Sequence, residues 1–380
     1  MTFRKSIFWL HLAAGLIAGT VIAILCLTGT ALAFEKEIIA YAERDARRIA
    51  SPATDVARLP LADLLNRVRT AHPNARPDGI VLQNHPLAAV AFTAGRTTTF
   101  YTDPYTGEIR QPASTGARDT LKLIEDWHRV LALGGDRRPI GKAITGACNL
   151  AFFVLAVSGL YLWWPRKWRT KGLRRSIWFI RRPADAKARD WNWHNVIGLW
   201  TAPILIVLTL TALPISYKWA GQMLFTITGT PPPPPTTASA TPAAKLFPPT
   251  PGAKLLSSED LIAVAQKQFP TWETLTYRAG TTQPATIAVR TADSWPRTAT
   301  TTLSLNPFTG EILKRAGYAE LNAAQQLRSW TRYLHTGEAV GWPGQLLAAI
   351  AALGGCVLVY TGFALVWHRW RRWRSSSVTP

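Results

Sequence analysis

Four long stretches of this 380-residue chain contain no aspartate, glutamate, lysine or arginine. They cover residues 6–34, 143–165, 191–217 and 339–368. Each is longer than the roughly 20 apolar residues with which an α-helix crosses a bilayer. The pattern predicts four membrane-spanning helices, and therefore a membrane protein built on an all-α four-helix transmembrane bundle.

The first of these stretches also has features of a cleavable signal peptide. Arg4 and Lys5 precede it, and the small residues Ala31 and Ala33 lie near its end. Its length, however, is about twice the roughly 7–15 residues of a signal-peptide core. We therefore expect a retained membrane anchor.

A fifth uncharged stretch, residues 219–244, contains five consecutive prolines at 231–235. Consecutive prolines cannot sustain helical hydrogen bonding in lipid and favour an extended conformation. We therefore expect this stretch to be a spacer and not a span. The Pro-rich linker is assigned to residues 228–252.

The segments between the first and second and between the third and fourth helices have shorter patterns. Each contains an amphipathic helical stretch that stops before a proline, followed by alternating apolar and polar residues typical of a strand. These features lie at residues 61–70 and 88–92 in the first segment and 261–268 and 285–289 in the second. They predict two α+β domains, in residues 35–139 and 218–338.

The two halves of the chain resemble each other. The motif His-x-x-x-Gly-Leu begins at His11 in the first helix and at His194 in the third. The turn sequence Pro-Tyr-Thr-Gly-Glu-Ile at 104–109 recurs as Pro-Phe-Thr-Gly-Glu-Ile at 307–312, where proline starts a turn and glycine supplies a positive φ. This self-similarity predicts an internal twofold parallel repeat, with a pseudo-twofold axis along the membrane normal.

Basic residues indicate the orientation in the membrane. The loop 166–190 carries ten lysines and arginines against two aspartates, and further basic residues flank the first and last helices. By the positive-inside rule this loop, the tail 369–380 and both termini are cytoplasmic, which leaves the α+β domains periplasmic in a bacterial inner membrane. The net charge of +21 thus reflects topology and contact with anionic lipid, not nucleic-acid binding.

The doubled turn, the histidines that flank it and the four-helix plan carry a family resemblance. Over nearly its whole length the chain resembles the PepSY-associated transmembrane family of iron-regulated inner-membrane proteins. The resemblance implies PepSY-like periplasmic domains, heme b in the membrane and reduction of ferric siderophores at the periplasmic face.

The source of electrons lies outside the chain in this interpretation. The chain lacks a flavin or nicotinamide domain, and no Gly-x-Gly-x-x-Gly follows a strand. A cytoplasmic flavoprotein or membrane quinol is therefore the expected donor. Arg169, Arg174 and Arg175 are candidates for docking an acidic flavoprotein, with contact to lipid as the alternative.

Four histidines are the candidate metal ligands. An ionisable residue within a spanning helix indicates function, so His11 and His194 form a first expected axial pair near the cytoplasmic face. Gly15 and Gly198 lie one helical turn further on the same faces, where a missing side chain admits a flat ring. Helix–helix hydrogen bonds and close helix packing are the alternative roles for these histidines and glycines.

His128 and His335 precede the second and fourth helices and form a second expected pair on the periplasmic side. Two separated histidine pairs in apolar surroundings match bis-histidine ligation of heme iron, whereas bare zinc or copper takes more protein ligands. Covalent attachment through Cys-x-x-Cys-His is excluded because the motif is absent. We therefore expect two hemes of b type, serving electron transfer.

Other residues receive weaker assignments. His368, which has no counterpart in the first half, is the alternative inner ligand or an interfacial polar residue. His72 and His85 are expected in solvated turns, and the three cysteines as small buried residues. Substrate-contacting aromatics are sought among Trp295, Trp330 and Trp342, with core packing as the alternative.

The resulting hypothesis is a di-heme b inner-membrane reductase. It would pass electrons from the cytoplasmic side or the quinol pool to a periplasmic ferric siderophore and release ferrous iron. One alternative is a membrane-anchored PepSY regulator of a periplasmic peptidase. Another is a heme reductase for a different periplasmic acceptor, such as copper or a disulfide-carrying partner.

Overall fold

The computed structural model describes eleven segments of the chain, which are residues 2–50, 56–95, 98–111, 116–164, 178–181, 183, 185–232, 246, 253–280, 283–296 and 299–376. Most of the Pro-rich linker lies outside them, as do Arg169, Arg174 and Arg175 with their possible flavoprotein contact. The chain divides into two compact units. A helical unit consists of Met1–Glu35, Leu121–Ile227 and Leu327–Pro380, and a sheet unit of Lys36–Thr120 and Thr228–Gln326.

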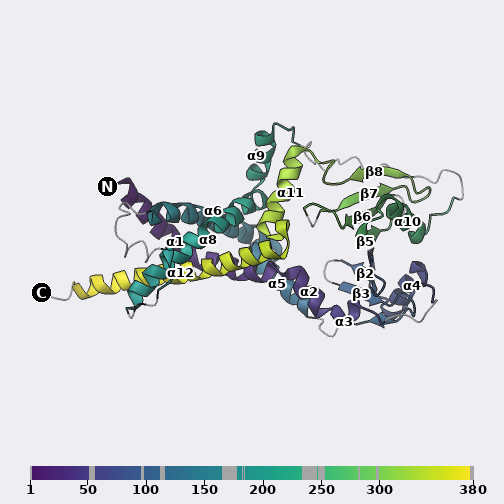
Figure 1. The fold of residues 1–380 in the computed structure, drawn as a ribbon, viewed down its shortest axis with the longest axis horizontal. Helices are drawn as coiled ribbons and strands as arrows, with labels where there is room; N and C mark the ends of the chain where they lie inside the picture. The colour runs from purple at the N-terminus through teal and green to yellow at the C-terminus, as the bar shows by residue number, and fades with distance from the viewer. Residues whose placement is uncertain are drawn as a thin grey trace. The chain divides into compact units, whose positions relative to one another are not determined.

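The helical unit contains four helices long and apolar enough to cross a membrane, which confirms the main prediction from the hydropathy pattern (Figure 1). They are α1 (Phe3–Leu32), α6 (Arg138–Trp163), α8 (Ala186–Ser216) and α12 (Trp342–Ser376). Within the unit α1 packs against α6 and α12, and α8 packs against the same two helices. The helices α1 and α8, which carry His11 and His194, are therefore diagonal to each other in the bundle.

Small residues set the spacing of the helices. A Cβ at Gly19 of α1 would lie 2.9 Å from the Phe363 ring of α12, and one at Gly355 would lie 2.6 Å from Cys26 Sγ. Such close approach is typical of helix pairs in membranes. Cys26 is buried here, and Cys148 and Cys356 pack against the same cluster, so the cysteines have the expected packing role.

Shorter helices flank the spans. α5 (Ala117–Val130) ends at the turn before α6, and α11 (Ala323–His335) ends before the turn into α12. The prediction that the uncharged run from residue 219 is an extended spacer is wrong for its first part, since α9 (Lys218–Thr228) is helical. This part contains no proline, and Ala220, Leu224 and Phe225 lie one turn apart on a buried face.

The sheet unit is built around one antiparallel sheet of eight strands, ordered β4-β3-β2-β1-β5-β6-β7-β8. The first four are β1 (Gly79–Gln83), β2 (Val90–Ala94), β3 (Thr98–Thr102) and β4 (Ile109–Arg110), and the second four are β5 (Trp272–Arg278), β6 (Ala285–Thr291), β7 (Thr301–Leu305) and β8 (Ile312–Ala316). Strands β1 and β5 pair antiparallel, with Val81 opposite Thr276. The segments before α6 and before α12 thus contribute four strands each to a shared sheet.

Two amphipathic helices form the core of this unit with the sheet. They are α4 (Leu61–Ala71) and α10 (Ser258–Gln268), close to the predicted bounds. Leu64 and Leu261 pack with Phe92 and Leu275 of the sheet in one hydrophobic cluster. The short helices α2 (Glu35–Ala42) and α3 (Arg44–Arg47) lead into this unit from α1.

The repeated turns adopt matching conformations. Asp103 Oδ1 accepts a hydrogen bond from Tyr105 N at 2.8 Å, and Asn306 Oδ1 accepts one from Phe308 N at 2.9 Å. The glycine of each turn has a positive φ, 74° at Gly107 and 72° at Gly310. The sequence prediction for the two glycines is confirmed, because this region of φ strongly favours glycine.

A buried ionic cluster ties α2, α3 and α5 to the sheet. Glu43 is 4% exposed and accepts hydrogen bonds from Arg118, Tyr101 and Arg47. Burial by itself would raise the pKa of Glu43, but the hydrogen bonds and charges of these partners outweigh it and lower the pKa. Burial and the neighbouring Glu43 carboxylate raise the pKa of Tyr101 to about 12, despite the opposing effect of Arg47.

Replacing Glu43 by alanine is expected to destabilise the protein by about 3–5 kcal/mol, because it leaves buried cations without a counterion. Because the pKa of Glu43 is lowered on folding, its contribution is present above its ordinary pKa of 4.5 and is lost as the pH falls through the lower folded-state value. Thermal unfolding of wild type and variant should therefore converge in acid. Glu108→Ala is the control, with a side chain 67% exposed and an expected cost below about 1 kcal/mol. Equal unfolding temperatures for both variants would contradict the prediction.

Candidate functional site

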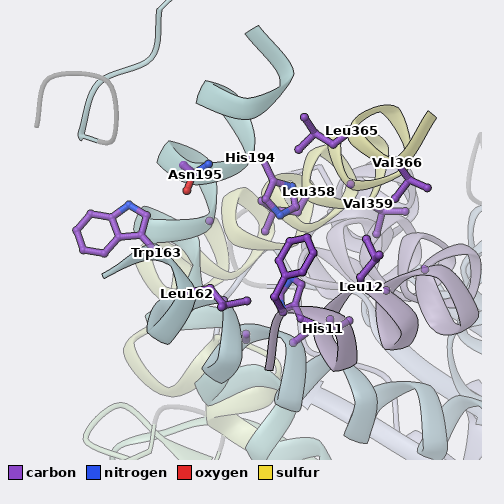
Figure 2. A pocket seen from close by; sticks show the side chains of 18 of the residues that line it. His11, Leu12, Leu162, Trp163, His194, Asn195, Leu358, Val359, Leu365 and Val366 are labelled. Carbon is purple, nitrogen blue, oxygen red and sulfur yellow. The ribbon is translucent and has the colours of Figure 1, made fainter. Parts of the chain in front are cut away.

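A cavity of about 1020 Å³ lies among the four spanning helices. This is at the upper end of the range for small-molecule sites, roughly 300–1,000 Å³. His11 of α1 and His194 of α8 both line it, as Figure 2 shows, and leucines and valines such as Leu12, Leu358 and Val359 form much of its wall. The structure therefore brings the first predicted histidine pair to one apolar cavity.

Glycines of the neighbouring helices support each histidine. A Cβ at Gly159 of α6 would lie 3.4 Å from His11 Cε1, and a Cβ at Gly362 of α12 would lie 3.7 Å from His194 Cε1. Each imidazole edge thus rests on a position without a side chain. Gly15 and Gly198 line the same cavity, where a Cβ would make only ordinary contacts of 3.9 Å with Leu155 and 3.5 Å with Leu358.

Both ring orientations are fixed by a hydroxyl group. His11 Nδ1 lies 2.9 Å from Ser158 Oγ, and His194 Nδ1 lies 2.9 Å from Thr361 Oγ1. Thr361 already donates its single hydrogen to the carbonyl of Val357 at 2.7 Å, and Ser158 donates to Leu155 at 3.3 Å. Each hydroxyl must therefore accept from the histidine, so Nδ1 carries the proton and Nε2 keeps a lone pair.

Ser158 and Thr361 were not among the predicted site residues. The sequence did hold a signal for them, because Ser158-Gly159 and Thr361-Gly362 occupy the same place near the ends of the second and fourth spanning helices. A hydrogen bond to the nitrogen that does not bind metal is a common feature of metal-ligating histidines, since it sets tautomer and ring orientation.

The second predicted pair also comes together. The rings of His128 and His335 have centroids 6.3 Å apart and planes inclined by 47°. Two imidazoles bound through Nε2 to one metal, each at about 2 Å, have ring centres roughly 6 Å apart. The observed separation therefore fits a shared metal between the two rings.

Hydrogen bonds fix these two tautomers in the same way. His335 Nδ1 lies 2.9 Å from the carbonyl oxygen of Leu208, which can only accept. His128 Nδ1 lies 2.9 Å from Thr28 Oγ1, whose hydrogen is donated to the carbonyl of Ile24 at 2.6 Å. Again Nδ1 is the donor and Nε2 keeps the lone pair. A Cβ at Gly29 would lie 3.2 Å from His128 Cε1, so this ring also rests on a glycine.

The environment keeps the second pair neutral. Burial lowers the pKa of His128 to about 4, and the neighbouring His335 lowers it further. Burial also lowers the pKa of His335. Both rings are therefore uncharged near pH 7, which is the form that binds a metal.

The pairs lie at two levels of the bundle. His11 and Thr28, the partner of His128, are 17 residues apart on α1, which is about 25 Å at 1.5 Å per residue. His194 and Leu208, the partner of His335, are 14 residues apart on α8, or about 21 Å. The hydrocarbon core of a bilayer is about 30 Å thick. The two sites together therefore extend across most of a membrane.

The sequence was compared with models of known families. The model of the PepSY-associated TM region matches residues 8–369, nearly the whole chain. The chain belongs to this family. No curated protein sequence matches it. All four paired histidines lie within the region that defines its membership of the PepSY-associated family.

The other histidines of this PepSY-associated protein have different surroundings. His368 Nε2 lies 3.2 Å from Asp190 Oδ2, and His368 is not among the residues that line the cavity. His85 is exposed, as expected for a turn. His72 is half-buried against the Phe100 ring, with centroids 4.6 Å apart, so the expectation of a solvated turn is wrong for it. It follows α4 directly, where the chain packs back onto the sheet.

The three candidate tryptophans are distributed over both units. Trp295 belongs to the sheet unit and is 55% exposed, whereas Trp330 lies on α11 and Trp342 begins α12 with 67% exposure. Within the described residues, no group of three or more His, Cys, Asp or Glu side chains could hold a metal ion by itself. The histidine pairs remain the candidate metal ligands.

Proposed function

We propose that this chain is a di-heme b inner-membrane reductase, which passes electrons from a cytoplasmic donor or the quinol pool to a periplasmic ferric siderophore. The observation that carries the proposal is the matched state of four histidines, each with Nδ1 donating and Nε2 available, grouped in two pairs. Heme supplies one-electron redox chemistry when bound. Axial ligation by two histidines uses both open positions of heme iron, which favours electron transfer.

The donor set fits heme better than a bare ion. A cavity with two imidazoles and apolar walls leaves the remaining coordination positions of a metal without protein ligands. A porphyrin supplies those four equatorial ligands itself. His11 and His194 would hold the inner heme, and His128 and His335 the outer one. The internal repeat of the chain explains why each site takes one histidine from each half.

Ferric siderophore is proposed as the acceptor from the family resemblance, with ferrioxamine as the first compound to test. Hard oxygen chelators hold ferric iron more tightly than ferrous iron, so one electron weakens the complex. The peptidase-regulator alternative leaves the four histidines without a role, and a different acceptor would use the same two pairs.

The visible spectrum of the purified protein tests the cofactor. Protein from heme-replete cells should contain two hemes per chain and show a sharp band on reduction with dithionite. The reduced protein should be reoxidised by ferrioxamine faster than by buffer, with ferrous iron trapped by a chelating dye. A colourless protein would refute heme binding, and reoxidation at the buffer rate would remove siderophores as substrate.

Reporter fusions test the proposed direction across the membrane. A reporter after Lys171 should be cytoplasmic and one after Thr236 periplasmic, because the basic loop follows the positive-inside rule. The reverse pattern would place the His11/His194 pair on the periplasmic side and invert the direction of electron flow.

The hydroxyl partners offer a test of the inner site. Thr361→Val removes the acceptor of His194 Nδ1–H while keeping the shape of the side chain. Loss of such a partner commonly weakens metal affinity 10–100-fold, so titration with hemin should show a comparable loss at one of the two sites. Thr361→Ser keeps a hydroxyl and should bind close to the wild-type level. Equal affinity of the Val and Ser variants would show that this hydrogen bond does not orient a ligand.

A further inference from the structure

The cavity that holds His11 and His194 is cationic at one end. Its lining includes Arg4 and Lys5 from the start of α1 and Arg369 and Arg372 from the last turns of α12. We call these four residues the cationic rim. Among the described residues no aspartate or glutamate lines the cavity. The site thus combines an apolar interior with an uncompensated positive end.

The rim lies at a constant depth relative to the histidines. Arg4 is seven residues before His11 on α1, and Arg369 is seven residues after Gly362, which touches His194. Seven residues correspond to about 10 Å along a helix. Since α1 begins and α12 ends at the same side of the bundle, both arginines lie about two turns from the histidines, in the same direction.

The arginines of the rim are held in place without acidic partners. Arg4 donates hydrogen bonds to the carbonyl oxygens of Leu162 and, at 3.0 Å, Trp164. The guanidinium of Arg369 lies 4.9 Å from the ring centroid of Trp9 and 5.9 Å from that of Phe8, which lines the cavity. Contacts with α6 and α1 thus hold both charges while their positive charge remains uncompensated by a carboxylate.

General enrichment of basic residues at cytoplasmic helix ends does not explain this placement. Arg371 and Arg374 belong to the same turns of α12, yet neither lines the cavity. The cations are therefore sorted, with Arg369 and Arg372 on the cavity side. An occupant with an apolar body and acidic groups at one end matches this distribution.

We propose that the cationic rim binds the carboxylates of the cavity's occupant, which are the two propionates of heme if the proposed function is correct. The rim then selects for a ligand with free carboxylates and directs its acidic edge toward the end of the bundle where α1 begins. Anionic phospholipid offers related chemistry at a helix end, and the experiment below separates these two occupants.

The test compares heme with heme dimethyl ester, in which both propionates are blocked. The full-length chain, purified in detergent from heme-deficient cells, is titrated with each and followed by its visible spectrum. In wild type, one of the two sites should bind the ester at least about tenfold more weakly than heme. In the double variant Arg369→Gln, Arg372→Gln this site should lose about tenfold in heme affinity and no longer discriminate between the two compounds.

The matched control is the double variant Arg371→Gln, Arg374→Gln, which removes the same charge from the same turns and should behave as wild type. Equal binding of heme and ester by wild type would overturn the inference but leave the proposed function standing. Failure to bind either compound would refute the proposed function itself. Unchanged heme discrimination in the Arg369/Arg372 variant, with loss of co-purified anionic phospholipid by mass spectrometry, would assign the rim to lipid and overturn the inference.

Discussion

Protein carrying His335→Ala is expected to retain one heme of two, and so roughly half of the reduced heme absorbance per chain. His335 is one of two rings whose centroids lie 6.3 Å apart, and its Nδ1 is committed to Leu208. Removing it leaves His128 as the single axial candidate of the outer site. The inner site, about 20 Å away along α8 at 1.5 Å per residue, keeps both of its histidines.

The activity of the His335→Ala protein should fall much further than its heme content. The outer pair is the one on the proposed periplasmic side, so its loss should interrupt transfer to a siderophore while the remaining heme is still reduced by the donor. Heme content, dithionite spectrum and reoxidation rate are measured on the same sample. His85→Ala, which alters an exposed histidine of the sheet unit, should keep two hemes. Two hemes in the His335→Ala protein would contradict the assignment.

The second large effect distinguishes His194 from His368 as the inner ligand. His194→Ala is expected to lose the inner heme completely, because His194 lines the cavity and offers Nε2 while Thr361 holds Nδ1. His368→Ala should retain it, because His368 Nε2 is directed to Asp190. Heme per chain should therefore be about one in the first variant and two in the second.

The converse result has a clear meaning. Loss of heme from His368→Ala together with retention in His194→Ala would show that the repeat identifies the wrong inner ligand. His11→Ala serves as the paired test, since a bis-histidine site requires loss of the same heme in His11→Ala and His194→Ala. Thermal unfolding of each variant shows whether the loss reflects the site or the fold.

The sequence by itself determined the membrane part of the fold. Uncharged stretches longer than 20 residues can bury their backbone in lipid only as helices, so each span is decided locally. The same holds for the turns at Gly107 and Gly310, whose positive φ is a property of a few adjacent residues. Histidines at matching positions of two similar halves also indicated which four side chains to pair.

Other features depend on which segments pack together, and the local pattern does not contain that information. The pairing of β1 with β5 joins residues about 200 positions apart into one sheet, and α9 became helical because one of its faces is buried. The tautomers followed only once Ser158 and Thr361 were found beside the rings. Likewise, the distinction of Arg369 and Arg372 from Arg371 and Arg374 comes from the packing of α12 beside α1, since helix phase and neighbours decide which charges face a cavity.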